Sequence, residues 1–255
     1  IVWLFSLQVV LDNGQKSDWF GSRWVRWTTA LSLSCFIGFI WRELTTKVPI
    51  VDLKVFLDRN FIVGTALNSV VGAVLYSTLA ILPLFLQHLM GYTATLSGLA
   101  ISPRGFGSLA GLVAVAVLSN KVDQRYVVIA GMLLLALSNI MFGSMNLSIG
   151  MGNIIFPNII CGFSFSLLMI PLMTITFVTL KNSQMTNASG IFNLAKSVGG
   201  AIGTSIVSTL IQRMGQVHQT HLIRNLTYSN PAFVEKLAAI QSGIAVYTGE
   251  FVARE

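Results

Sequence analysis

Two long stretches of this chain carry no charged side chain. Asp, Glu, Lys and Arg are absent from the 44 residues of 60–103 and from the 55 residues of 126–180. A water-soluble helix needs a polar face, whereas a membrane-spanning helix needs about 20 mostly apolar residues to cross roughly 30 Å of hydrocarbon. Each stretch is long enough for two crossings. The chain is therefore predicted to be an all-α, polytopic transmembrane helix bundle.

Composition also favours the bilayer as solvent. Charged residues make up 10% of the chain, against about 25% in an average soluble domain. The net charge of +7 does not indicate a nucleic-acid partner, because most of the 16 Lys and Arg lie in short segments between apolar stretches, where they act as topology signals. An integral-membrane enzyme would need clustered His, Asp or Glu, and the predicted spans contain no acidic residue. We expect no enzyme, cofactor or metal site, and buried free thiols at Cys35 and Cys161.

Five crossings are predicted, over residues 61–86, 95–119, 126–145, 154–180 and 188–211. They are preceded by a polar loop at 11–26, a short apolar span at 27–41 and an amphipathic connector at 42–60, which is expected to lie along the membrane surface. The first ten residues resemble the end of another crossing, so the chain is interpreted as a fragment of about six to seven helices. Three regions follow: 1–60, a five-helix bundle at 61–211, and a polar extracytoplasmic segment at 212–255 before a missing last span. Kinks are predicted at Pro83, Pro157 and Pro171.

Loop charges predict the orientation. Seven Lys and Arg fall on one side of the predicted spans and three on the other, and the side richer in these residues faces the cytoplasm. The loops at 87–94 and 146–153, which lack Lys and Arg, are then outward-facing. Residues 212–255 are outward-facing as well, and they include a sequon-like Asn225-Leu226-Thr227.

Short motifs occur along almost the whole chain in one order. They are Pro49 to Leu53, Leu82-Pro83, Gly91-Tyr92-Thr93-Ala94, the loop Lys121 to Arg125, Pro171-Leu172, and Gly203-Thr204-Ser205. This order resembles the second half of fourteen-span drug:proton antiporters of the major facilitator superfamily, the EmrB/QacA type. The chain departs from that pattern at Ala116, Tyr126, Lys196 and Arg104.

The resemblance implies a function. It implies multidrug efflux by proton antiport through alternating access in the bacterial inner membrane, with small amphipathic or cationic drugs, protons and the lipid bilayer as partners. A periplasmic adaptor and an outer-membrane channel are candidate partners of the complete protein. The chain would supply helices seven to thirteen, and the proton-carrying acids would lie largely in the absent half. The alternative is a non-transporting truncated fragment or a membrane interaction module.

Four charged residues are candidates for gating. Asp123 and Arg125 resemble a cytoplasmic latch between two conformations, or else are ordinary topology charges. Lys196 and Arg104 lie within predicted spans, where a charge must face a cavity, find a partner or snorkel to the interface.

Small and polar residues within the spans supply the other candidates. Gly107 with Gly111, and Gly199 with Gly203, have the spacing that lets helices approach closely, for sliding or for static packing. The candidates for the substrate path combine aromatic, thioether and polar groups, which also fill gaps in any bundle. They are Asn68, Tyr76, Asn158, Phe163, Met169, Met173, Thr174 and Asn193. His88, His218 and His221 are expected to be solvated rather than to bind metal.

Overall fold

The computed structural model describes residues 2–14, 21–46, 53–119, 121–146 and 149–224. Every regular element in these ranges is helical, so the all-α prediction is confirmed. Within these ranges, five helical segments are long and apolar enough to span a membrane: Arg59–Leu89, Ala94–Leu118, Gln124–Gly143, Met151–Phe177 and Asn182–His221. The first four correspond to predicted crossings, with ends that differ by no more than three residues.

The chain divides into two compact units, residues 1–207 and 208–255. Helix α8, Met185–Arg224, begins in the first unit and ends in the second. The last crossing, predicted to end at Ile211, is therefore followed by 13 more helical residues. The side chains from 210 to 221 are exposed, and Gln, Arg and Met among them favour helix without needing an apolar neighbour. The rest of the predicted polar segment, with Asn225, lies outside the described residues.

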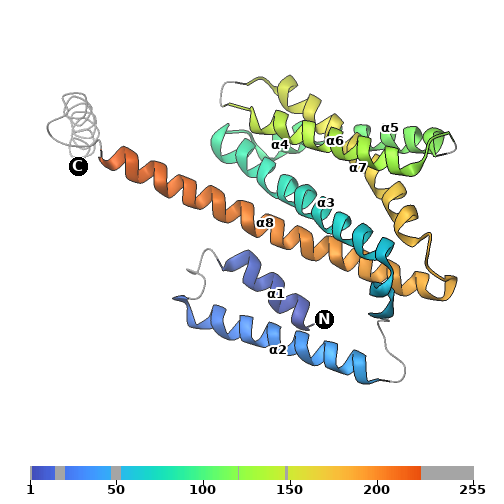
Figure 1. Ribbon diagram of the computed structural model, residues 1–255. Helices are drawn as coiled ribbons and strands as arrows, with labels where there is room; N and C mark the ends of the chain where they lie inside the picture. Colours follow the sequence, from blue (N-terminus) through green and yellow to red (C-terminus); the bar gives the residue numbers. More distant parts are fainter. Residues whose placement is uncertain (1, 15–20, 47–52, 120, 147–148, 225–255) are drawn as a thin grey trace, which may run out of the picture. The chain divides into compact units, whose positions relative to one another are not determined.

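Helices α1, Val2–Asn13, and α2, Arg23–Thr45, pack against each other (Figure 1). The Ser32 hydroxyl of α2 donates to the Trp3 carbonyl at 3.0 Å, and the Trp3 and Phe36 rings lie 4.9 Å apart. Because α2 begins at Arg23, the predicted loop ends earlier than expected and Trp24 is helical. Residues 47–52 of the predicted connector lie outside the described residues, and η3, Leu53–Leu57, follows.

Helix α3, Arg59–Leu84, begins at a capping carboxylate: Asp58 accepts a hydrogen bond from the Phe61 amide at 3.1 Å. The helix type changes just after Pro83, where α3 passes directly into the π-helix η4, Phe85–Leu89, and the kink expected at Pro83 stays a prediction. Proline removes one hydrogen-bond donor from a helix, and a π-turn is one way to accommodate the altered register.

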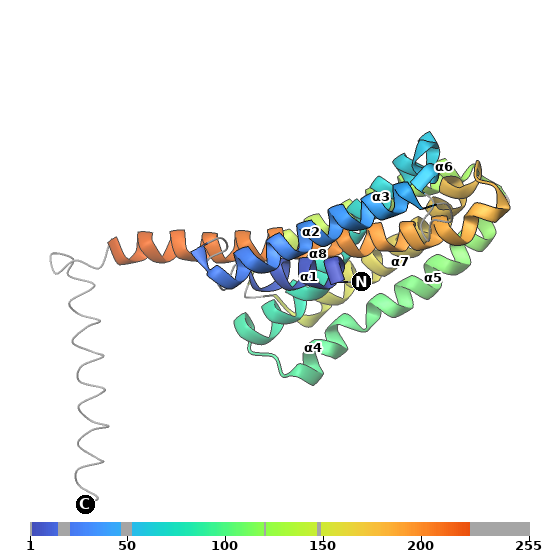
Figure 2. The ribbon, with the colours of Figure 1, turned by 90° about the horizontal axis from the view of Figure 1, so that it is seen from below.

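The next crossing is built from two helices, α4, Ala94–Ile101, and α5, Pro103–Leu118, joined at Ser102 (Figure 2). No break is predicted here from the sequence. Pro103 has no N–H to donate to the Leu99 carbonyl, and that carbonyl accepts a 2.9 Å hydrogen bond from the Ser102 hydroxyl instead. The side chain thus repairs locally what the proline disrupts.

Helix α7, Met151–Phe177, is central to the first unit. In its 18-residue apolar stretch half of the residues are buried, whereas a third or fewer are buried in the corresponding stretches of the other four candidate spans. It packs on α5, on α6, Gln124–Gly143, and on α3 (Figure 1). Pro157 and Pro171 are fully buried within it. A short turn, η5, Asn182–Gln184, then leads into α8.

Candidate functional site

Four of the eight predicted substrate residues lie together at a cavity between α7 and α8, termed here the α7–α8 hollow. Its volume is about 480 Å³, within the usual range for small-molecule sites. Met169, Met173 and Thr174 line it from successive turns of α7, and Asn193 lines it from α8. The remaining lining residues are Ile170, Phe177, Val178, Met185 and Phe192.

The α7–α8 hollow combines soft apolar surface with a few polar atoms. The rings of Phe177 and Phe192 meet edge to face at 5.4 Å, and the methionine thioethers can adapt to ligands of different shape. The Thr174 hydroxyl donates to the Ile170 carbonyl, and the Asn193 amide donates to the Ser189 carbonyl. The Thr174 hydroxyl hydrogen and one Asn193 N–H are used within their own helices, so the two side chains offer two acceptor oxygens and one remaining N–H donor. Such a lining suits apolar or cationic molecules.

The other four predicted substrate residues do not line the α7–α8 hollow. Asn68 is fully buried and donates to the Phe192 carbonyl at 2.7 Å, joining α3 to α8. Asn158 is fully buried and donates to the Ile154 carbonyl of its own helix. Tyr76 lies with its ring against Gly200. Phe163 packs beside the cluster of Val115, Val127 and Leu167.

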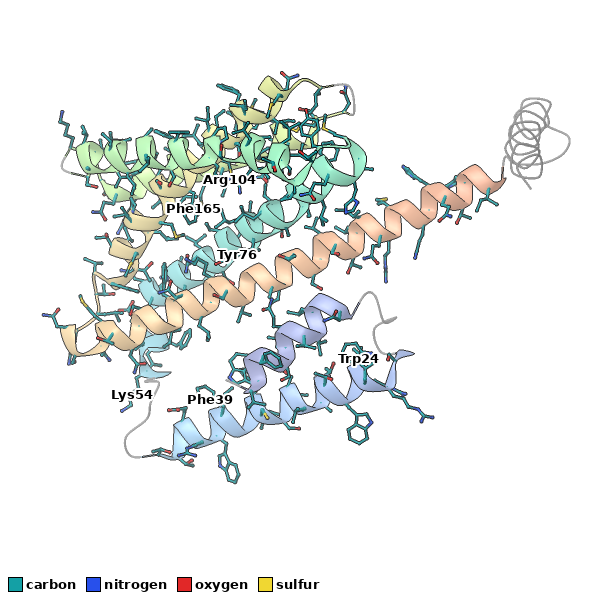
Figure 3. The ribbon with its side chains drawn as sticks, turned by 180° about the vertical axis from the view of Figure 1, so that it is seen from behind. Trp24, Phe39, Lys54, Tyr76, Arg104 and Phe165 are labelled. Carbon is teal, nitrogen blue, oxygen red and sulfur yellow. The ribbon has the colours of Figure 1, made fainter. Side chains whose placement is uncertain are left out.

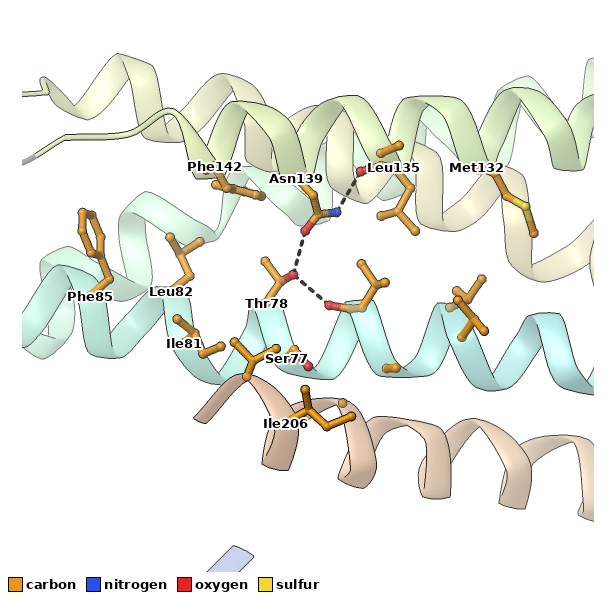
Figure 4. A pocket seen from close by; sticks show the side chains of 18 of the residues that line it. Ser77, Thr78, Ile81, Leu82, Phe85, Met132, Leu135, Asn139, Phe142 and Ile206 are labelled. Atoms are coloured by element: carbon orange, nitrogen blue, oxygen red, sulfur yellow. Dashed lines mark hydrogen bonds between the residues drawn. The ribbon is translucent and has the colours of Figure 1, made fainter. Parts of the chain in front are cut away.

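A larger cavity of about 730 Å³, the α3–α6–α8 hollow, lies between α3, α6 and α8 (Figure 4). None of the eight predicted substrate residues lines it. Its lining is mostly aliphatic, crossed by one hydrogen bond of 3.2 Å from the Thr78 hydroxyl to the Asn139 side-chain oxygen. Sequence analysis missed this cavity because its walls are ordinary apolar residues, although a paired Thr78 and Asn139 within spans was an available signal.

The four predicted packing glycines each lie where two helices approach closely. Gly107 and Gly111 of α5 lie against the Ile159 and Phe163 carbonyls of α7, and Gly199 lies against the Ser69 carbonyl of α3. A Cβ added to Gly203 would lie 2.7 Å from the Cα of Ala73. Further glycines at comparable contacts, which sequence analysis did not single out, are Gly64, Gly72, Gly131, Gly162 and Gly200.

The predicted gating residues occupy different environments. Asp123 and Arg125 are both exposed, and the Asp123 carboxylate caps α6 by accepting from the Arg125 amide at 3.0 Å. Lys196 is half-buried, with its stem beside Gly72. Arg104 is half-buried near the start of α5 (Figure 3), and its guanidinium has no acceptor within hydrogen-bonding distance among the described residues. The latch assigned to Asp123 and Arg125 stays a prediction.

Histidines and cysteines form no metal centre in the part of the chain that the structure describes, where no group of three or more His, Cys, Asp or Glu is suitably placed. His218 and His221 are exposed on α8, and His88 lies in η4. Cys35 and Cys161 are both free cysteines, and Cys161 is buried in α7 as predicted. The predicted burial of Cys35 is wrong, because this residue of α2 is half-buried.

Asp58 connects two segments that sequence analysis did not link. Its pKa is lowered from the ordinary 3.8, first by a hydrogen bond from the Thr179 hydroxyl just after α7 and then by one from the Phe61 amide. The carboxylate thus caps α3 and also contacts the segment that follows α7. Both contacts favour its charged form.

Comparison with known proteins identifies the family. Residues 7–204 match the family model described as Major Facilitator Superfamily. The chain belongs to the major facilitator superfamily. This confirms the resemblance drawn from the ordered motifs and assigns the chain to a family of transporters rather than enzymes.

Three curated relatives indicate which members of the superfamily this chain resembles. The chain is 34% identical to the fatty acid resistance protein FarB of Neisseria gonorrhoeae, over 96% of this chain and 48% of that protein. It is 30% identical to the multidrug export protein EmrB of Haemophilus influenzae, over 88% of this chain and 44% of that protein. It is 32% identical to the probable multidrug resistance protein EmrY of Escherichia coli, over 89% of this chain and 44% of that protein.

The chain therefore spans about half the length of the curated relatives it matches. Superfamily membership and the five candidate spans of the described residues make it a multi-pass integral membrane protein of the bacterial inner membrane. Its relatives are named for resistance and multidrug export.

Proposed function

We propose that the complete protein to which this chain belongs exports small amphipathic or cationic compounds by alternating access, driven by the proton gradient. This chain would supply one wall of the substrate path and part of the gating apparatus. Support comes from membership of the superfamily and from relatives named for multidrug export and fatty acid resistance.

The α7–α8 hollow is the observation that carries the proposal. Met169, Met173, Thr174 and Asn193 contribute thioethers and acceptor oxygens beside the Phe177 and Phe192 rings. This mixture can hold molecules that share amphipathic character rather than one shape. The α3–α6–α8 hollow is larger and also contains phenylalanine, methionine and polar side chains, but most of its lining is aliphatic. Aromatic, thioether and polar side chains make up most of the lining of the α7–α8 hollow, so we assign substrate to the α7–α8 hollow.

Proton coupling is assigned to residues outside these spans. The five candidate spans contain no Asp or Glu, and a carboxyl group within the membrane is the usual carrier of a transported proton. Asp123, Arg125 and Lys196 are proposed to bias the conformational equilibrium rather than to carry protons. The proposal that an adaptor and an outer-membrane channel continue the path rests on the resemblance alone.

Ethidium export in inverted vesicles tests this proposal. The full-length protein containing this chain should move ethidium when a pH gradient is present, and collapse of the gradient should stop the movement. M173A should raise the apparent KM several-fold because it removes a thioether from the α7–α8 hollow. M141A removes a methionine from α6, outside both hollows, and should leave the apparent KM unchanged.

Two results would count against the proposal. Ethidium movement that continues after the pH gradient has collapsed would refute proton coupling. Equal effects of M173A and M141A would remove the assignment of substrate to the α7–α8 hollow.

A further inference from the structure

Arg104 places a positive charge close to the middle of a candidate span. Phe106 is the midpoint of the 25-residue segment Ala94–Leu118, so Arg104 lies two residues, about 3 Å along the axis, from its centre. Its three guanidinium nitrogens are buried, so in this conformation the side chain does not snorkel to a membrane interface.

The surroundings of Arg104 leave its charge uncompensated. Its Nε, Nη1 and Nη2 atoms are buried, and no acceptor among the described residues lies within hydrogen-bonding distance of them. Its backbone carbonyl contacts Gly162 of α7, whose chain neighbour Cys161 is a free, buried cysteine. A thiol does not neutralise a guanidinium.

A second unsatisfied polar atom lies on the same face of α7. The Asn158 side-chain oxygen is buried without a hydrogen-bond donor among the described residues, and Asn158 precedes Gly162 by four residues, one helical turn. Apolar residues occur one further turn away on each helix: Ala100 on α4 and Ile154 on α7 are both fully buried and belong to one cluster. A charged group is thus followed by a strongly apolar region.

A buried, unpaired positive charge favours the binding of an anion. A buried, unpaired charge costs several kcal/mol, and the planar guanidinium fork matches the two oxygens of a carboxylate. An apolar region beside the charge matches an amphiphile that has a carboxylate head and a hydrocarbon tail. One relative, 34% identical to this chain, is named for resistance to fatty acids.

We propose that Arg104 binds the carboxylate of a fatty-acid-like substrate during the transport cycle. This inference rests on the proposed export function and names one substrate class for it. Because the guanidinium nitrogens are covered in the present arrangement, the carboxylate is admitted in another conformation of the cycle. Arg104 then sets the preference for acids, while the α7–α8 hollow supplies general affinity for apolar molecules.

Equilibrium binding to the full-length protein in nanodiscs tests this role. The probes are palmitate, hexadecanol, which has the same chain without a carboxylate, and ethidium. R104Q should weaken palmitate binding by at least about tenfold, the loss expected for one charge-assisted hydrogen bond, and leave hexadecanol and ethidium unchanged. R104K keeps the charge but not the fork and should restore part of the palmitate affinity. R213Q removes an exposed arginine from α8 and should leave all three affinities unchanged.

The outcomes separate this inference from the proposed function. Palmitate affinity that R104Q leaves unchanged, while the protein still exports ethidium, would overturn the role of Arg104 and leave the proposed function intact. A parallel loss for all three probes would mean that Arg104 pairs with an acidic side chain of the protein, which also overturns the inference. A wild-type protein that binds none of the probes would count against the proposed function itself.

Discussion

The side-chain amide of Asn68 donates a hydrogen bond of 2.7 Å to the backbone carbonyl of Phe192. The two residues are 124 positions apart, and their bond joins α3 to α8 within the first unit. Phe192 also forms part of the wall of the α7–α8 hollow. The position of that wall is therefore tied to α3 by a residue that does not line the hollow.

Replacing Asn68 with leucine should destabilise the bundle by about 1 kcal/mol, because hydrogen bonds between membrane helices are worth roughly 0.6 to 1.7 kcal/mol. Thermal unfolding in detergent measures the change. S34A removes an exposed hydroxyl that hydrogen-bonds only within α2; it is the control and should have a smaller effect. Equal stabilities of N68L and the wild type would show that the bond adds nothing to helix association.

Two glycines of α8 should differ in how alanine substitution changes the stability of the protein. A Cβ at Gly199 would collide with the backbone carbonyl of Ser69, whereas Gly190 has nothing within 4 Å. G199A should therefore destabilise the protein by about 1 to 3 kcal/mol, the usual cost of overpacking. G190A should be neutral, or stabilising by up to about 1 kcal/mol, because alanine favours helix. Similar unfolding temperatures for the two variants would contradict this packing.

Adding a phenylalanine ring to each hollow should separate their roles. T174F places the ring in the α7–α8 hollow, and A136F places it in the α3–α6–α8 hollow. Ethidium export should fall several-fold for T174F, since the added ring occupies the volume assigned to substrate. It should be close to wild type for A136F, provided that protein levels in the membrane match. The reverse order would transfer the substrate site to the larger hollow.

Asp58 should make stability depend on acidity. Its pKa lies below the ordinary 3.8 in the folded chain, so its contribution is fully present above the unfolded value and is lost as pH falls through the folded value. Unfolding temperatures in detergent from about pH 7 to about pH 3 should therefore fall less steeply for D58N than for the wild type. T179V removes the main cause of the shift and should also flatten the profile. Unaltered pH profiles in both variants would argue against this interaction.

The crossings were predictable because their signal is local. An uncharged apolar segment of sufficient length has few alternatives to a membrane helix, and the first four predicted spans end within three residues of the observed helices. The end of α8 was not predictable in this way, since polar residues after Ile211 can continue a helix in water. The interruption at Pro103 depends on the Ser102 hydroxyl bonding to Leu99, which the presence of a proline does not reveal.

Positions within the bundle were less predictable than the spans. Met169, Met173 and Thr174 share a face of α7 by their spacing, but their meeting with Asn193 depends on which helix packs beside α7. Asn68 and Asn158 looked equally suitable for substrate, and their burial decides against direct contact with the α7–α8 hollow. Helix neighbours and rotation, rather than residue type, separate these groups.

The backbone carbonyl of Arg104 lies where a Cβ of residue 162 would be, and it fits there because residue 162 is glycine. A substitution at position 104 leaves that carbonyl in place, so α5 and α7 can stay joined whatever side chain occupies it. A substitution at position 162 introduces a Cβ into the interface and separates them. The charge at position 104 can therefore be changed without disturbing the packing of α5 on α7, whereas any side chain at position 162 disturbs it.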